Sequence, residues 1–133
     1  LCRLKLFLIV SSGLLLTGSL SAQKLTFCEA ATSDGKAVNA ASNFYITRQG
    51  NYVTIMTAGR KPFECGSITV DLFSVSADGK EKLEETQQLT VQHYSTWTSC
   101  NSILREPGTY RAYAYDESGK LLGVGEIKAT YKP

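Results

Sequence analysis

Histidine is nearly absent from this sequence, and its scarcity limits the available chemistry. His93 is the only imidazole among 133 residues, and no C-x-x-C pair accompanies it. The usual ligand spacing of a zinc site is therefore missing. No G-x-S-x-G motif and no glycine-rich phosphate loop occurs either. We expect no metal site, no cofactor and no catalytic residue, so the sequence predicts a protein that is not an enzyme.

The carboxylates give the same expectation. Glu84 and Glu85 are adjacent in a segment that is predicted to be a strand. Successive side chains of a strand point to opposite faces, so the pair would not flank one bond as acid and base. Cys65 or Cys100 as a nucleophile would need His93 as its base. An enzyme is accordingly the last of the alternatives that we consider.

An excess of positive charge is also missing. The chain has 14 Lys and Arg against 12 Asp and Glu. Removal of an N-terminal leader would take Arg3 and Lys5 with it and leave the signs balanced. A neutral domain has no basic field to attract phosphates, so we expect no nucleic-acid partner.

A long hydrophobic run is missing as well. The apolar stretch over residues 6–16 is shorter than the roughly 20 residues of a membrane-spanning helix. Arg3 and Lys5 precede it, and Ser21 and Ala22 follow it near a cleavage point. This layout is typical of a Sec-type signal peptide. We therefore predict a signal peptide at 1–22, a single domain at 23–133, a secreted or periplasmic location, and no stable membrane span after processing.

Two alternatives to cleavage remain open at this point. The leader could stay attached as a membrane anchor. Cys28 could instead carry a lipid, although the large Phe27 stands where a lipidation site has a small residue.

A helical stripe of a dozen residues is not found, and turn signals recur instead. Asp-Gly, Gly-Asn, Pro-Gly and Ser-Gly pairs separate runs rich in Thr, Val, Ile, Tyr and Phe. The predicted strands span 24–30, 43–47, 52–58, 67–76, 81–94, 102–104, 109–115 and 121–130. We expect an all-β protein, an immunoglobulin-like antiparallel β-sandwich of seven to eight strands, with 43–47 and 52–58 paired as a hairpin.

Alternation along the predicted strands assigns their faces. Ile68, Val70 and Leu72 share one face, and the phase then slips, which predicts a β-bulge near Leu72 and Phe73. Two glycines, Gly123 and Gly125, lie within the last strand. They predict a bend or a bulky neighbour at that place.

Three cysteines remain beyond the leader: Cys28, Cys65 and Cys100. In an oxidising compartment an odd number predicts one disulfide and one spare thiol, with three possible pairings. Antiparallel strand directions bring Cys65 and Cys100 to the same end of a sandwich. We therefore favour a Cys65–Cys100 disulfide with Cys28 as the free thiol, while Cys28 could also replace either partner.

The segment "PGTYRAYAYD" at 107–116 resembles the penultimate strand of fibronectin type III and other immunoglobulin-like modules. The resemblance implies that Tyr110 packs inward and that its hydroxyl bonds back to the preceding loop. In immunoglobulin domains the tryptophan lies well ahead of the second cysteine, whereas Trp97 and Cys100 nearly adjoin. The resemblance therefore implies architecture and not function.

Four aromatic residues are candidates for ligand binding: Tyr94, Trp97, Tyr113 and Tyr115. An exposed aromatic row on a rigid sheet provides apolar ring faces for stacking sugars. The expected function is a small binding or structural module that recognises a protein or polysaccharide at the cell surface. The alternatives are a carbohydrate-binding module that uses these aromatics, and a subunit that docks to a surface or secretion assembly by edge-strand addition.

Overall fold

The computed structural model describes residues 23–133, and this part of the chain is built from strands. The predicted signal peptide at 1–22 lies outside the described residues. Between Gln23 and Pro133 there is no helix, and so none that is long and apolar enough to span a membrane. The strands are β2 (Gln23–Cys28), β3 (Ala30–Ala31), β4 (Ala37–Val38), β5 (Asn43–Ile46), β6 (Asn51–Ala58), β7 (Ser67–Val75), β8 (Glu81–Thr90), β9 (Trp97–Leu104), β10 (Gly108–Asp116) and β11 (Leu121–Tyr131).

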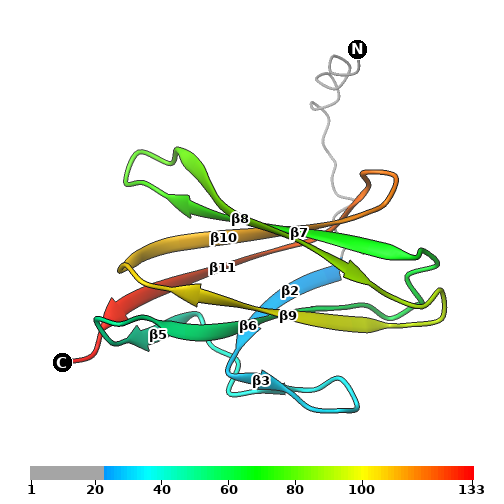
Figure 1. Ribbon diagram of the computed structural model, residues 1–133, viewed down its shortest axis with the longest axis horizontal. Helices are drawn as coiled ribbons and strands as arrows, with labels where there is room; N and C mark the ends of the chain where they lie inside the picture. Colours follow the sequence, from blue (N-terminus) through cyan, green and yellow to red (C-terminus); the bar gives the residue numbers. More distant parts are fainter. Residues whose placement is uncertain (1–22) are drawn as a thin grey trace.

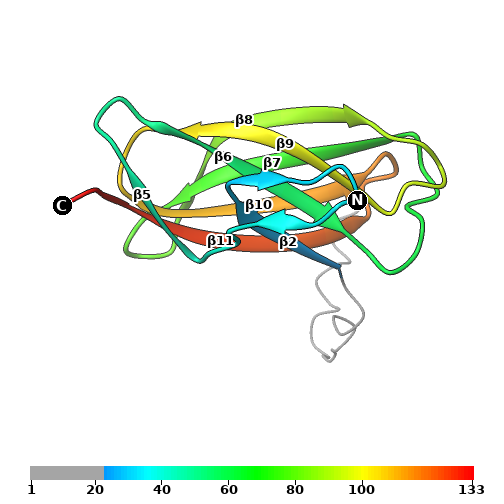
Figure 2. The ribbon, with the colours of Figure 1, turned by 90° about the horizontal axis from the view of Figure 1, so that it is seen from below.

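Eight of these strands form one sheet that folds over into two layers (Figures 1 and 2). The order is β8-β7-β10-β11-β2-β6-β9, with β5 beside β11. Strands β2, β6 and β9 make one layer, and β8, β7, β10 and β11 make the other. The neighbouring strands of each layer pair antiparallel. The predicted all-β sandwich is thus confirmed.

The first part of strand β11 pairs parallel with β2 and so joins the two layers. Its last part pairs parallel with β5 within its own layer. A Cβ atom placed on Gly125 would lie 2.5 Å from the carbonyl oxygen of Leu25 in β2. A glycine is therefore required at Gly125, where β2 crosses β11.

The predicted hairpin of 43–47 with 52–58 is wrong. Strand β5 pairs with β11 in one layer, whereas β6 pairs with β2 and β9 in the other. The intervening turn, in which the Gly50 N–H bonds to the Thr47 carbonyl at 2.9 Å, carries the chain from one layer to the other. The turn at 48–51 was predicted correctly. The strands that pair with β5 and β6, however, are distant in sequence and are not determined by the turn.

The core lies between the layers and follows the predicted alternation. Ile68, Val70 and Leu72 are buried, as are Val53 and Ile55 on β6 and Ile127 on β11. The register between β7 and β8 shifts at Leu72 and Phe73, where the bulge was predicted. Burial of these apolar faces is the main favourable term in the stability of such a sandwich.

One predicted strand ends earlier than expected, and another begins earlier. The segment 81–94 leaves the sheet after Thr90, and the short 102–104 piece belongs to an eight-residue strand, β9. The Val91 side chain turns into the core, while its N–H bonds to the Gly66 carbonyl at 3.1 Å. Residues 91–96 thus pair with the loop before β7.

A small hairpin, β3 and β4, covers the outer face of the β2-β6-β9 layer. Cys28 is buried beside it, with its thiol near the backbone of Ala30 and Val38. The Thr54 hydroxyl donates to the Glu29 carbonyl at 3.2 Å and ties the hairpin to β6. The hairpin therefore removes much of this face from solvent.

Candidate functional site

A groove of about 940 Å³ lies on the side of the sandwich where β8 and β9 face each other. Strand β8 is the edge of one layer and β9 is the edge of the other. Toward the end of β9 the two strands diverge (Figure 1). The β7–β8 hairpin and the 105–107 connection form the walls of the groove.

Side chains from β8 close the gap beyond the groove. The Gln87 amide donates to the Asn101 carbonyl on β9 at 2.8 Å. The Ser102 hydroxyl donates to the Glu85 carboxylate. The two edges are therefore pinned together at their middle and open toward the β7–β8 turn.

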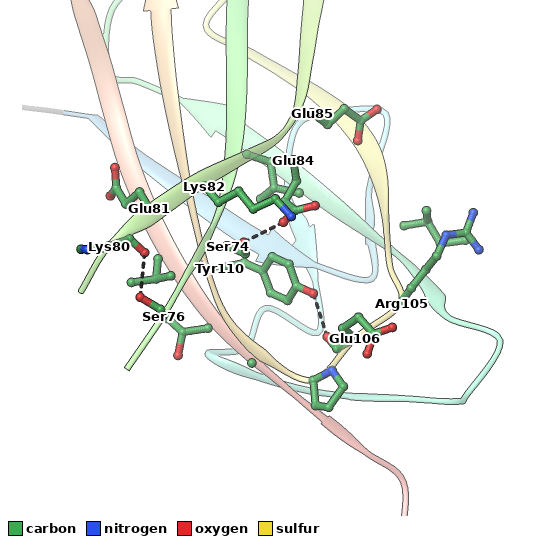
Figure 3. Close-up of a pocket in the computed structure, with 16 residues that line it drawn as sticks. Ser74, Ser76, Lys80, Glu81, Lys82, Glu84, Glu85, Arg105, Glu106 and Tyr110 are labelled. Atoms are coloured by element: carbon green, nitrogen blue, oxygen red, sulfur yellow. Dashed lines mark hydrogen bonds between the residues drawn. The ribbon is translucent and has the colours of Figure 1, made fainter. Parts of the chain in front are cut away.

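A bulge in β8 changes which carboxylates line the groove. Leu72 stands opposite Glu85, and Phe73 stands opposite Leu83, so Glu84 is the extra residue. The Glu84 carboxylate accepts from the Ser74 hydroxyl at 2.6 Å, and both Glu84 and Glu85 line the groove (Figure 3). The expectation that these two carboxylates point to opposite faces is wrong, because a bulge breaks the alternation.

The base of the groove is apolar and rigid. Leu72, Val75, Ile103 and Tyr110 contribute to its lining. Tyr110 is buried, and its hydroxyl donates to the Glu106 carbonyl at 2.7 Å (Figure 3). This is the contact that the immunoglobulin-like resemblance implied. Burial raises the pKa of the Tyr110 hydroxyl, so it stays protonated as a donor.

Tyr113 and Tyr115 lie on the outer face of the β8-β7-β10-β11 layer, away from the groove. Both are half-buried, and their rings stack at 6.4 Å between centroids. Phe73, which was not among the predicted ligand-binding aromatics, contacts Tyr113 edge-to-face at 5.5 Å. The result is an aromatic row across β7 and β10.

A charged cluster adjoins this row. Arg111 bonds to Glu81 at 2.6 Å and to Glu126 at 2.8 Å. The Tyr113 hydroxyl donates to Glu81, and this bond, followed by that from Arg111, lowers the pKa of the Glu81 carboxyl. The bonds to Glu126 and Glu81 raise the pKa of Arg111. These polar tips are satisfied by one another.

Trp97 lies on the opposite outer face, beneath the β3–β4 hairpin. A Cβ atom on Gly35 would be 2.5 Å from the Trp97 ring, so the turn rests directly on the indole. Tyr94 lies in the 91–96 connection and is 76% exposed. The four predicted aromatics are therefore divided between two faces and a loop, and they do not form one sugar-stacking platform.

The predicted Cys65–Cys100 disulfide is absent, since Cys28, Cys65 and Cys100 are each buried and unbridged. The Cys65 thiol lies in the loop before β7, where it donates to the Ser67 carbonyl at 3.4 Å. Cys100 stands inside β9, opposite Ile55. The pairing assumed that Cys100 lies at the strand end, which the true start of β9 at Trp97 contradicts.

His93 is exposed in the 91–96 connection, where its carbonyl accepts from the Glu64 N–H at 3.0 Å. Among residues 23–133 no group of three His, Cys, Asp or Glu residues is placed to hold a metal ion.

A smaller hollow of about 490 Å³ lies between β5 and the beginning of β6. Two strongly exposed tyrosines, Tyr45 and Tyr52, line it together with asparagines. Sequence reasoning missed this pair. The available signal was the presence of two tyrosines on either side of one Gly-Asn turn.

Comparison with solved structures finds this fold in other proteins. Two variants of superoxide reductase (neelaredoxin) from Ignicoccus hospitalis match with TM-scores of 0.50 and 0.52 and identities of 12% and 10%. They cover 86% of this chain and 85% and 84% of their own. An immunoglobulin-like protein from Pseudomonas aeruginosa matches with a TM-score of 0.49 and 10% identity, covering 82% of this chain and 90% of its own. No family model and no curated protein matches the chain.

These matches overturn the prediction that the protein is not an enzyme. Superoxide reductase is an enzyme, and it shares this architecture. Similarity at such low identity shows the fold alone, and one fold hosts many functions. The all-β architecture therefore gives no ground for excluding catalysis, and the comparisons support the β-sandwich fold alone.

Proposed function

We propose that the protein is a binding module that holds an extended segment of a partner protein in the groove between β8 and β9. One observation carries this proposal: two edge strands, one from each layer, border the same groove. Within residues 23–133 neither strand has a second strand partner. Their outward N–H and C=O groups match those of an added strand.

The side chains that line the groove indicate which residues the bound partner segment should contain. An extended chain places alternate side chains on the two sides of its backbone. One set would meet the apolar lining at Leu72, Val75 and Ile103, and the other would meet Glu84 and Glu85. We expect a segment that alternates apolar residues with basic or hydroxyl-bearing ones, because carboxylates accept charge-assisted bonds from such groups.

Self-association through β8 is disfavoured by the same side chains. Glu81, Glu84 and Glu85 outnumber Lys82 at the beginning of the strand, so two copies would bring like charges together. Charged residues and a bulge are common devices that protect an edge from indiscriminate pairing. A partner of complementary charge avoids this penalty.

Two predictions from the sequence, which concern residues outside the groove lining or the fold as a whole, also support the proposal. The leader at 1–22 favours a secreted or periplasmic protein with partners at the cell surface. The Tyr110–Glu106 bond supports a closer likeness to the architecture of fibronectin type III modules.

Site-specific photocrosslinking tests this function in the producing cell. A photoreactive residue replaces Lys82 or Arg105 in the groove, or Lys120 in the β10–β11 turn as the control. Partner adducts are expected from the groove positions and not from Lys120.

The purified partner should then slow hydrogen exchange of β8 and β9 amides. Equal adducts from Lys120, or unchanged exchange in both strands, would contradict strand addition.

A further inference from the structure

The hollow between β5 and β6 holds two of the most exposed aromatic rings of the described chain. Tyr45 is 61% exposed and Tyr52 is 71% exposed, and both line the hollow. The hollow lies at the same end of the sandwich as the groove, since Asn51 pairs with Leu104 where β9 ends. It is a separate site, because the two sets of lining residues do not overlap.

Both rings are carried by strands. Tyr45 pairs with Thr130 in β11, and Tyr52 pairs with Ile103 in β9. The backbone under each ring is therefore fixed by the sheet, so ligand contact costs little backbone ordering. Rigid tyrosines with an apolar ring and a polar tip are suited to a ligand that is itself apolar on its faces and polar at its rim.

The polar lining of the hollow is rich in amides. Asn39, Asn43 and Asn51 contribute to it, and each amide side chain both donates and accepts hydrogen bonds. The Asn39 amide donates to the Glu29 carboxylate at 2.9 Å, and the Asn51 side chain accepts from the Thr47 N–H at 2.7 Å. These bonds hold two of the three amides in place.

The charges of the hollow balance. Apart from the two tyrosines, Glu29 and Lys132 are the ionisable side chains of its lining. A balanced pair gives no net attraction for a phosphate, a sulfate or a polyanion. The combination of open rings, amides and balanced charge selects an uncharged ligand with many hydroxyl groups.

From this arrangement we propose that the hollow binds a neutral saccharide, with Tyr45 and Tyr52 stacking on sugar rings and the asparagines bonding hydroxyl groups. This site differs from the aromatic set predicted from sequence, and it stands independently of the proposed peptide groove. Loss of one activity by mutation would leave the other intact.

Titration calorimetry of the whole protein with mannohexaose, cellohexaose, chitohexaose and anionic tetragalacturonate tests the proposal. At least one neutral hexasaccharide should bind. Tyr45→Ala or Tyr52→Ala should raise its Kd roughly tenfold, because the stacking on the sugar ring is lost. Tyr52→Phe should retain most of the affinity. Tyr94→Ala is the matched control, since Tyr94 is also strongly exposed but lies outside the hollow.

Three results would overturn the saccharide site. One is the absence of binding by all three neutral oligosaccharides. Another is wild-type affinity in both tyrosine-to-alanine variants, or an equal loss in Tyr94→Ala. The last is tighter binding of tetragalacturonate than of every neutral sugar, which would point to an anion site.

Discussion

The hydroxyl of Tyr110 donates a 2.7 Å hydrogen bond to the carbonyl oxygen of Glu106. This bond spans the connection from β9 to β10 and links a buried ring to the wall of the groove. The shape of the groove is therefore coupled to the packing of the core.

Tyr110→Phe should lower the free energy of unfolding by about 1–2 kcal/mol, because the Glu106 carbonyl loses its partner while the ring still packs. Urea denaturation measures the change. Tyr94→Phe is the control, since Tyr94 is exposed and its hydroxyl faces water. Equal stability of Tyr110→Phe and the wild type would show that water replaces the bond at no cost.

Gly35→Ala should release the β3–β4 hairpin from Trp97. The new methyl group would meet the indole at 2.5 Å, and Gly35 has a φ of +84° that disfavours alanine. Because Trp97 is the only tryptophan, its fluorescence should shift to longer wavelength as water reaches the ring. Gly79→Ala is the matched control, with a φ of +88° but nothing within 4 Å. A red shift in both variants, or in neither, would argue against the contact.

Gly125→Ala should cost about 3 kcal/mol, at the upper end of overpacking penalties, because its methyl group meets backbone atoms that cannot turn aside. The atom in its way is the Leu25 carbonyl oxygen, 2.5 Å from the new Cβ. Thermal unfolding beside Val124→Ala, which changes an exposed neighbour, isolates the effect. A stability loss no larger than that of Val124→Ala would mean that β2 does not cross β11 here.

Stability should fall as the pH rises from 9.0 toward about 11. Burial, with a smaller contribution from Glu85, raises the pKa of the Cys100 thiol from 9.0 to about 11. In this range the unfolded chain has lost a proton that the folded chain retains, so alkali favours unfolding. Cys100→Ala should make the free energy of unfolding less sensitive to pH over this range. Identical slopes for variant and wild type would contradict the shift.

The three described cysteines should react with a thiol reagent only after unfolding. Each is buried, and burial raises the pKa of all three thiols, so little thiolate is available to react. Titration of a chain that begins at residue 23 should give three thiols in denaturant and almost none without it. A single thiol in denaturant would instead indicate one disulfide.

Much of the sandwich was readable from local patterns. Ile68, Val70 and Leu72 alternate because one face of β7 is buried. The register does shift at Leu72 and Phe73 as predicted, but the extra residue lies in β8 and not in β7. The end of β8 at Thr90 could not be predicted from the local sequence. Residues 91–96 continue a strand-like composition, yet they bond to the loop at 63–66, for example through Phe63 to Ser95 at 2.8 Å. Such pairing is set by distant residues.

The candidate sites were less predictable than the fold. The groove forms only because the edge strands β8 and β9, from the two layers, lie next to each other. The positions of Glu84 and Glu85 depend on a bulge in β8, which is visible only in the pairing of β8 with β7. The hollow depends on β5 pairing with β11 instead of with β6. Tyr45 and Tyr52 were visible as residues, but their shared hollow was not.

The parallel pairing of β2 with β11 has a mechanical consequence. The chain enters this pair at Gln23 and leaves past Tyr131 at the opposite end of the sandwich (Figure 1). Tension between these two points drags the strands past each other along their length, so their backbone bonds share the load and fail together. A protein tethered at both ends would resist stretching in this geometry far better than one whose terminal strands peel apart bond by bond.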